Sequence, residues 1–239
     1  MDKIQENLLA EIADLHGVPE GAYNIRSNGV SVQRNCTANI DIETKNDKSG
    51  IDIYIRPGTK NESVHIPVIL DKNGLKEKVY NDFHIGEGAD VVIVAGCGIH
   101  CGGADDMQHD GIHTFYVEKN ARVKYIEKHY GEGDGNGKRV LNPETVIYLA
   151  EGAYMEMEAT QIKGVDSTVR VTKAKVGDNA KLVIHEKIMT HGNQLAKTDF
   201  IVDLDGENSA ANVVSRSVAK DNSKQIFISN IRGNNKCSG

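Results

Sequence analysis

A short stretch near the middle of the sequence combines two cysteines with two histidines: Cys97, Cys101, His109 and His113. Thiolate sulfur and imidazole nitrogen are the protein ligands that hold iron and zinc, and thiolates also hold iron–sulfur clusters. Each pair has a spacing of four, which keeps its two members roughly on one face of either a strand or a helix. The stretch therefore predicts metal or cluster ligation by these four residues.

The same stretch allows a less specific interpretation. Its cysteine spacing matches no standard zinc pattern. Gly98, Gly102 and Gly103 are typical of a loop that folds back on itself. Asp105 and Asp110 add carboxylates that would serve as oxygen ligands or as hydrogen-bond partners of the ligands. The alternative is a solvated loop that carries a buried structural thiol.

A further candidate thiol, Cys237, lies close in sequence to Lys236 and Arg232. Nearby positive charge stabilises a thiolate and lowers the pKa of the thiol. We therefore predict Cys237 as the catalytic thiol, suited to accepting sulfide or persulfide. The alternative is a flexible cysteine without a chemical role.

One glycine-rich stretch, residues 131–139, resembles a phosphate-binding loop but lacks two required features. A Walker A motif needs glycine at the position of Glu132, and it needs serine or threonine at the position of Arg139. The acidic side chains of the stretch would also repel phosphate. We expect that no ATP is bound by this chain.

Composition excludes several classes of protein. The net charge is −6 and no basic stripe is present, so nucleic acid is not an expected partner. The longest apolar runs, such as Val91–Ala95, are too short to cross a bilayer. The acidic N-terminal stretch lacks the cationic start of a signal peptide. Four irregularly spaced cysteines do not form a secreted disulfide scaffold, so a cytoplasmic location is expected.

Two regions are expected from the hydrophobic periodicity: a helical segment at residues 1–20 and a β domain at residues 21–239. Ile4, Leu8, Ile12 and Leu15 form one apolar stripe, which predicts a helix over residues 2–15. We expect this helix to pack against one end of the domain. From Gly21 onward, apolar and polar residues alternate, as expected for strands.

A short sequence motif recurs between the predicted strands. In each copy a turn residue, usually Gly or Asn, is followed by Ala and then by an alternating strand. Gly and Asn enter the left-handed backbone region at low cost, so they suit a sharp corner. Such units bury their apolar face only by stacking, which predicts an all-β solenoid, with a β-sandwich as the alternative. The repeated alanines are Ala89, Ala121, Ala153, Ala180 and, in a weaker fifth copy, Ala210.

Several segments of this sequence resemble the core domain of SufB and SufD proteins, most closely the short, single-component versions found in anaerobes and archaea. The segments are Gly88–Cys97, His109, Asn120–Tyr125, Ser215–Ala219 and Gly233–Gly239. The resemblance covers the sequence from about Ser31 onward. It implies a right-handed parallel β-helix that serves as a scaffold, on which iron and sulfide are built into a transient iron–sulfur cluster.

The resemblance also implies partners. They are SufC, an ABC-type ATPase that binds a helical region after the β-helix, a sulfur donor, and a second chain in a homodimer or a SufB/SufD-type heterodimer. In the family, a segment like Cys237-Ser238-Gly239 continues with His and a Glu-Cys-Asp stretch before the helices. We therefore expect the docking region to lie outside this chain.

Taken together, the sequence favours a scaffold component of an iron–sulfur cluster assembly complex that works with a SufC-like ATPase, and not an enzyme with turnover of its own. One alternative is a β-helix enzyme or binding protein for polysaccharide. The absence of Trp and an aromatic content of 5% count against it, because sugar sites rely on aromatic stacking. The other alternative is a purely structural repeat protein, which leaves the Cys/His stretch unexplained.

Overall fold

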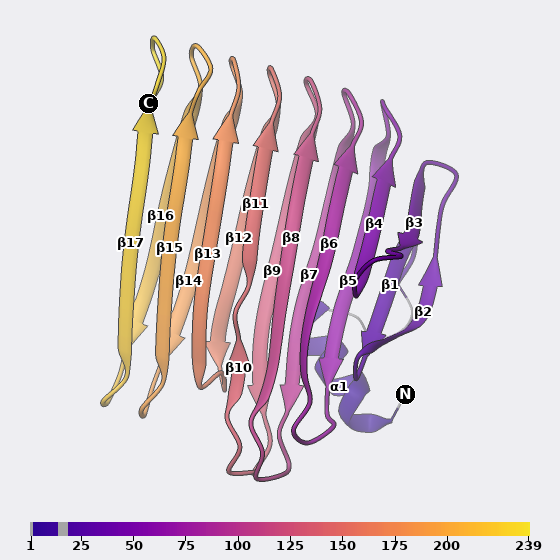
Figure 1. Ribbon diagram of the computed structural model, residues 1–239, viewed down its shortest axis with the longest axis vertical. Coiled ribbons are helices and arrows are strands. Elements are labelled where there is room, and N and C mark those ends of the chain that lie inside the picture. The colour runs from indigo at the N-terminus through magenta and orange to yellow at the C-terminus, as the bar shows by residue number, and fades with distance from the viewer. Residues whose placement is uncertain (1, 14–18) are drawn as a thin grey trace.

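The computed structural model describes residues 2–13 and 19–239, and the chain forms a β-solenoid of about six turns (Figure 1). Strands of successive turns stack side by side in two sheets, and beyond the first hairpins all pairing is parallel. The solenoid predicted from the repeat is therefore confirmed. Sheet A contains β1 (Ala22–Ser27), β2 (Val30–Asn35), β5 (Lys60–Leu70), β7 (Asp90–His100), β9 (Arg122–Glu132), β12 (Tyr154–Lys163), β14 (Lys181–Thr190) and β16 (Ala210–Ala219). Sheet B contains β3 (Ile40–Thr44), β4 (Gly50–Ile55), β6 (Lys76–Ile85), β8 (Met107–Val117), β10 (Arg139–Leu141), β11 (Glu144–Leu149), β13 (Ser167–Val176), β15 (Leu195–Leu204) and β17 (Lys224–Gly233).

A left-handed residue forms one corner of each turn and links it to the next. The N–H of Gly88 donates to the carbonyl of Lys119 at 2.9 Å, and the N–H of Asn120 donates to that of Glu151 at 3.0 Å. The small residue that follows, such as Ala121, is fully buried inside the corner. The corner residues, all with positive φ, are Gly58, Gly88, Asn120, Gly152, Asn179, Asn208 and Cys237.

The repeat differs from the sequence-based prediction at two copies. The fifth corner is at Asn208, and the buried small residue is Ser209, one position before the predicted Ala210. Serine fits here because its hydroxyl donates to the carbonyl of Gly206 at 2.7 Å. An earlier corner at Gly58 escaped the prediction because Thr59, and not alanine, follows it.

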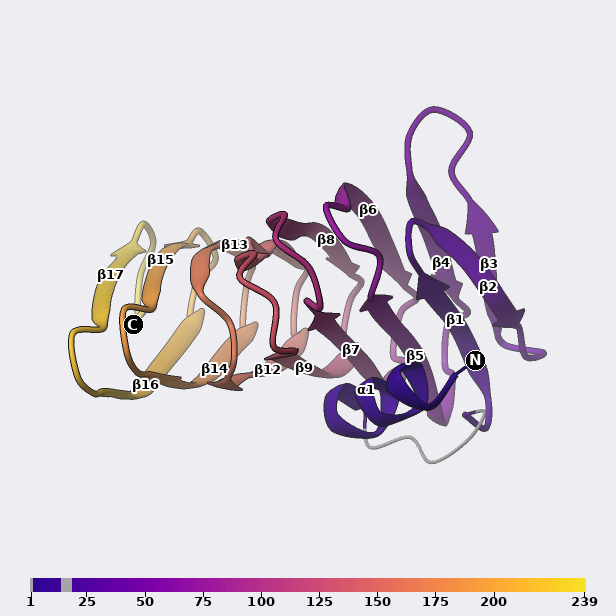
Figure 2. The ribbon, with the colours of Figure 1, turned by 90° about the horizontal axis from the view of Figure 1, so that it is seen from below.

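The first strands do not follow the parallel pattern expected for residues 21–239. β1 pairs with β2, and β3 pairs with β4, in two antiparallel hairpins. In Figure 2 these hairpins splay apart at the N-terminal end, whereas later turns close into a flattened tube. The solenoid therefore has a wider N-terminal end.

Helix α1 (Lys3–Ala13) packs on the outer face of sheet A, against β5, β7 and β9. Leu8 and Ile12 are fully buried there. Gly96 allows the close approach, because a Cβ at this position would lie 2.5 Å from the carbonyl oxygen of Ile12. The predicted helix is confirmed for residues 3–13, but it packs on a face of the sheet and not against one end of the domain. Residues 14 and 15 of the prediction lie outside the described residues.

At 11 residues, α1 is the only helix in the described part of the chain and is much too short to span a bilayer.

Two apolar groups fill the interior of the tube. The larger group lies toward the corner alanines, and a smaller one, which includes Leu70, Ile99 and Met107, lies toward the opposite edge. Polar side chains lie on the same inward faces of these strands, between the apolar positions. This buried polar layer contains both of the predicted histidines, His109 and His113.

Candidate functional site

Strand β8 presents two of the predicted histidines to the interior. Its residues alternate strictly between buried and half-buried, so His109, Gly111 and His113 share the inward face. A Cβ on Gly111 would stand 3.2 Å from Nε2 of His109 and 3.4 Å from Nε2 of His113. Glycine at the middle position therefore leaves space for both imidazole rings.

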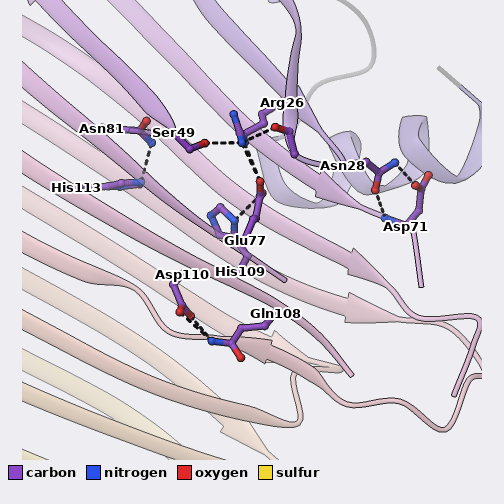
Figure 3. Close-up of polar contacts among 11 residues, drawn as sticks. Arg26, Asn28, Ser49, Asp71, Glu77, Asn81, Gln108, His109, Asp110 and His113 are labelled. Carbon is purple, nitrogen blue, oxygen red and sulfur yellow. Dashed lines mark hydrogen bonds and ion pairs between the residues drawn. The ribbon is translucent and has the colours of Figure 1, made fainter. Parts of the chain in front are cut away.

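His109 is held by an acidic partner on the neighbouring strand. Its Nδ1 lies 2.9 Å from Oε1 of Glu77, and the other oxygen of Glu77 accepts a hydrogen bond of 3.0 Å from Nε of Arg26 (Figure 3). Burial raises the pKa of Glu77, but the hydrogen bonds and charges of His109 and Arg26 outweigh it and hold that pKa below its ordinary value. Glu77 is thus an ionised carboxylate that orients the His109 ring and leaves its Nε2 facing inward.

His113 belongs to a hydrogen-bond chain with a defined direction. The Asn81 amide donates to Nε2 at 3.3 Å, so Nδ1 carries the proton and donates to the Tyr125 hydroxyl at 2.7 Å. That hydroxyl donates to Oε1 of Glu127 at 3.0 Å. Burial lowers the pKa of His113 to about 4, so the ring is neutral at pH 7.

Arg170 is the fully buried cation that balances the acids of the layer. It donates to Glu127, lies 3.6 Å from Oε1 of Glu186, and approaches Nδ1 of His129 at 3.3 Å. Burial raises the pKa of Glu127, but Arg170 and His129 hold it well below its ordinary value. Glu186 also accepts hydrogen bonds from Thr198 and from Ser215. We call this layer the interior polar cluster; it comprises Glu77, Asn81, His109, His113, Tyr125, Glu127, His129, Arg170 and Glu186.

Cys97 lies on β7 and not in a loop, and its side chain is 3% exposed. It faces a small space of about 20 Å³, which His109, His113, Glu127 and His129 also line. We call this space the interior cavity. Burial, with the nearby charges of Glu77 and Glu127, raises the pKa of Cys97 well above its ordinary value. The thiol is therefore protonated at neutral pH and is not poised as a nucleophile.

Cys101 does not join the other three predicted ligands at this cavity. It follows the end of β7, and its thiol donates weak hydrogen bonds to the carbonyl oxygens of Gly103 and Asp105, at 3.7 and 3.9 Å. A spacing of four in an extended strand places two Cα atoms about 13 Å apart, so Cys97 and Cys101 do not approach each other. Within residues 2–13 and 19–239, no group of three or more His, Cys, Asp or Glu side chains is arranged to hold a metal ion. Ligation by the predicted residues stays a prediction.

Cys237 is exposed and lies far along the chain from the interior cavity. It occupies the last left-handed corner, with a φ of 53°. Arg232, one of its two expected cationic neighbours, forms an ion pair with Asp203 at 2.7 Å. The predicted reactivity of Cys237 therefore depends on Lys236 more than on Arg232.

Sequence reasoning missed the charged half of the cluster. Glu127, His129 and Arg170 lie on strands where charged residues are normally assigned to the solvent face. The available signal was their position in the strand. Alternate residues of β9 face inward, and Glu127 and His129 continue the series of buried positions that begins with Val123 and Tyr125. On β14 the same alternation buries Glu186 and leaves His185 on the outer face.

Comparison with known families identifies the fold that carries this cluster. Residues 77–239 match the family model described as the SUF system FeS cluster assembly, SufBD core domain. The chain belongs to the SufBD family. The match includes Cys97 and the whole interior polar cluster, and it excludes α1 and the two N-terminal hairpins.

Two archaeal SufBD proteins illustrate the relationship. A protein of Archaeoglobus fulgidus named iron–sulfur cluster assembly SufBD family protein is 28% identical over 177 residues, which is 73% of this chain and 46% of the relative. A SufBD protein of Methanocaldococcus jannaschii is 28% identical over 119 residues, which is 49% of this chain and 37% of the relative. The matched part thus spans less than half the length of these SufBD relatives.

Proposed function

We propose that this SufBD chain is a scaffold component of an iron–sulfur cluster assembly complex. The observation that carries the proposal is the meeting of one thiol, Cys97, with the imidazoles of His109, His113 and His129 around one cavity. Thiolate and imidazole are ligands for iron, and thiolates hold the irons of clusters. The cavity lies largely within the range that matches the SufBD core domain.

The size of the cavity limits what it holds. A space of about 20 Å³ accommodates one water-sized species, so the cavity suits a single iron or sulfur atom and not a complete cluster. Because Cys97 is protonated, ferrous iron would have to displace the thiol proton on binding, and acid would oppose that binding. His113 is neutral and would not have to lose a proton to bind iron. Both of its ring nitrogens are already hydrogen-bonded, however, so iron would have to replace one of these bonds. We propose Cys97 and His109 as the first contacts for this cargo.

Further parts of the proposal concern partners and location. We propose that a SufC-like ABC ATPase supplies the energy of ATP, because residues 131–139 lack the features of a phosphate loop. We propose that the thiolate of exposed Cys237 attacks the outer sulfur of a donor persulfide, so that the donor S–S bond breaks, Cys237 becomes the persulfide and the donor thiol leaves. We propose that a second SufBD chain joins the complex, as the SufB/SufD resemblance implies. Four free thiols suit the reducing cytoplasm.

Anaerobic reconstitution with ferrous iron and sulfide tests the proposal. We expect the visible absorption of thiolate-bound iron, and we expect it to be lost in Cys97→Ala and weakened in His109→Ala. Cys36→Ala is the matched control, because Cys36 is exposed and does not line the interior cavity; its thiol donates to Asp41 at 3.3 Å. Equal absorption in wild type and Cys97→Ala, with folding intact, would remove the proposed role of Cys97.

The partner is tested separately. The natural protein that contains this chain is co-expressed with a SufC-like ATPase and purified through a tag on the ATPase. Co-elution in a defined ratio supports the complex, and separate elution of two folded proteins contradicts it. Because this readout needs no cluster, it is independent of the reconstitution.

A further inference from the structure

A second cavity, of about 210 Å³, opens between the two N-terminal hairpins. Its wall contains three cationic side chains, Arg26, Arg34 and Lys48, together with the polar side chains of Asn24 and Ser31. No Asp or Glu lines it. We call this space the N-terminal cavity; apart from Val79 and Asn81, its lining lies outside the range that matches the SufBD core domain.

The positive charge of this cavity is only partly balanced. Arg26 is paired with Glu77 and also donates to the carbonyl of Gly29 and the hydroxyl of Ser49 (Figure 3). Arg34 has no carboxylate partner in the part of the chain that the structure describes; its Nε and Nη1 donate to Asn24 and to the carbonyl of Ile42. The ammonium of Lys48 lies 4.7 Å above the Tyr80 ring, a contact that leaves its hydrogen-bond donors available.

Asn24 adds an oriented donor. Its Oδ1 accepts hydrogen bonds from Nε of Arg34 and from the Ser31 hydroxyl. Since the Arg34 nitrogen is only a donor, this atom of Asn24 must be the oxygen, and the amide nitrogen points elsewhere. The side chain is 5% exposed and lines the cavity, yet its Nδ2 has no partner among the described residues. This donor is therefore free to bind an acceptor that enters the cavity.

We propose that the N-terminal cavity binds a small oxyanion, of the phosphate or carboxylate class. Arg34, Asn24 and Lys48 all line the cavity, and Nη2 of Arg34, Nδ2 of Asn24 and the ammonium of Lys48 have no hydrogen-bond acceptor among the described residues. Guanidinium binds planar or tetrahedral oxyanions through its forked N–H groups. The opening arises from the antiparallel hairpins, because they hold the sheets apart where later turns close. Ile66 and Val68 line both this cavity and the interior cavity, so the anion would lie next to the proposed cargo site.

Titration calorimetry at constant ionic strength tests the site with inorganic phosphate, sulfate and acetate as separate probes. We expect saturable binding of at least one probe, and the tightest of the three assigns the class. Arg34→Gln should weaken it about tenfold, the effect of losing a charge-assisted hydrogen bond. Arg56→Gln is the matched control, since it removes the same charge from an exposed arginine outside the cavity.

A second variant keeps the test decisive. Arg34 also donates hydrogen bonds to Asn24 and to Ile42, so its loss would weaken the hairpins as well as the site. Lys48→Gln lowers the charge of the cavity without removing a hydrogen bond found among the described residues. We expect Lys48→Gln to weaken binding several-fold while thermal unfolding stays unchanged. No saturable binding of any probe, or equal weakening by Arg34→Gln and Arg56→Gln, would overturn the proposal. Neither result bears on cluster assembly, which has its own readout.

Discussion

Strands β6 and β8 carry histidine and aromatic rings on both faces, and the two faces use them differently. On the inner face, His113 joins Asn81, Tyr125 and Glu127 in a directed hydrogen-bond chain. On the outer face, four rings stack in register at centroid distances of 4.8, 5.0 and 5.4 Å. We call this row the exterior ladder; it comprises Tyr54, His84, Tyr116 and Tyr148.

The difference lies in solvation. Side chains of the exterior ladder are each about 40% exposed, so water satisfies their polar atoms and the stack contributes packing alone. Inside, each polar group needs a protein partner, and charge there shifts the pKa values of its neighbours. The ladder also offers no platform for sugars, because the ring faces of His84 and Tyr116 cover one another. The polysaccharide alternative therefore gains no support from it.

The largest effect is expected on breaking the buried ion pair. Arg170→Met removes the cation between Glu127 and Glu186, both at most 2% exposed. Two buried carboxylates without a cation should cost about 3–5 kcal/mol of unfolding free energy. The measurement is urea denaturation followed by circular dichroism at pH 7.

An outward-facing pair on the same strand provides the control. Lys173 of β13 is paired with Glu144 at 2.8 Å, and both are well exposed. Lys173→Met should therefore cost below about 1 kcal/mol. Equal costs for the two variants would mean that the interior polar cluster is as well solvated as the outer surface. That result would contradict the difference in solvation between the two faces.

A smaller effect is expected from pH. The pKa of His113 is about 4 in the folded state, against about 6.5 in an unfolded chain. Between these values the unfolded state binds a proton that the folded state does not, so the free energy of unfolding falls as pH decreases. Between pH 7 and 5, His113 should account for a loss of about 2 kcal/mol.

His113→Gln should abolish that part of the loss, whereas His84→Gln should leave it unchanged. Burial also lowers the pKa of His129, so some pH dependence remains in the variant. Comparing urea midpoints of the three proteins at pH 7 and pH 5 isolates His113. The same slope in wild type and His113→Gln would show that His113 becomes protonated inside the tube.

The fold was largely predictable because its corners need residues with a special backbone conformation. Asn120 and Asn179 have φ values of 56° and 55°, and small residues follow them. The first N-terminal hairpin carried a signal that the prediction did not use, because Asn28-Gly29 is a typical two-residue hairpin turn and both residues have positive φ. The second was not predictable, because alternation of apolar and polar residues does not distinguish antiparallel from parallel pairing. Two corners did not match the predicted pattern, because Thr59 and Ser209 occupy the position at which the pattern requires alanine.

The site was only partly predictable for a related reason. Cys97, His109 and His113 stood out by residue type and do line one cavity. Arg170 did not stand out, because an arginine in an alternating strand is normally solvated. Its burial depends on Glu127, 43 residues earlier, and on Glu186. A sequence without strand register does not show that these three charges meet.

The smallest effect concerns the exterior ladder. Tyr116→Ala removes the stacking contacts with His84 and Tyr148 and should cost about 1 kcal/mol. Tyr116→Phe keeps the ring and should cost almost nothing, since no hydrogen bond of the hydroxyl occurs among the described residues. Thermal unfolding measures both costs, and anaerobic reconstitution of both variants should equal wild type. A reconstitution defect in stable Tyr116→Ala would mean that the outer face takes part in cluster assembly. It would contradict the assignment of the chemistry to the inner face alone.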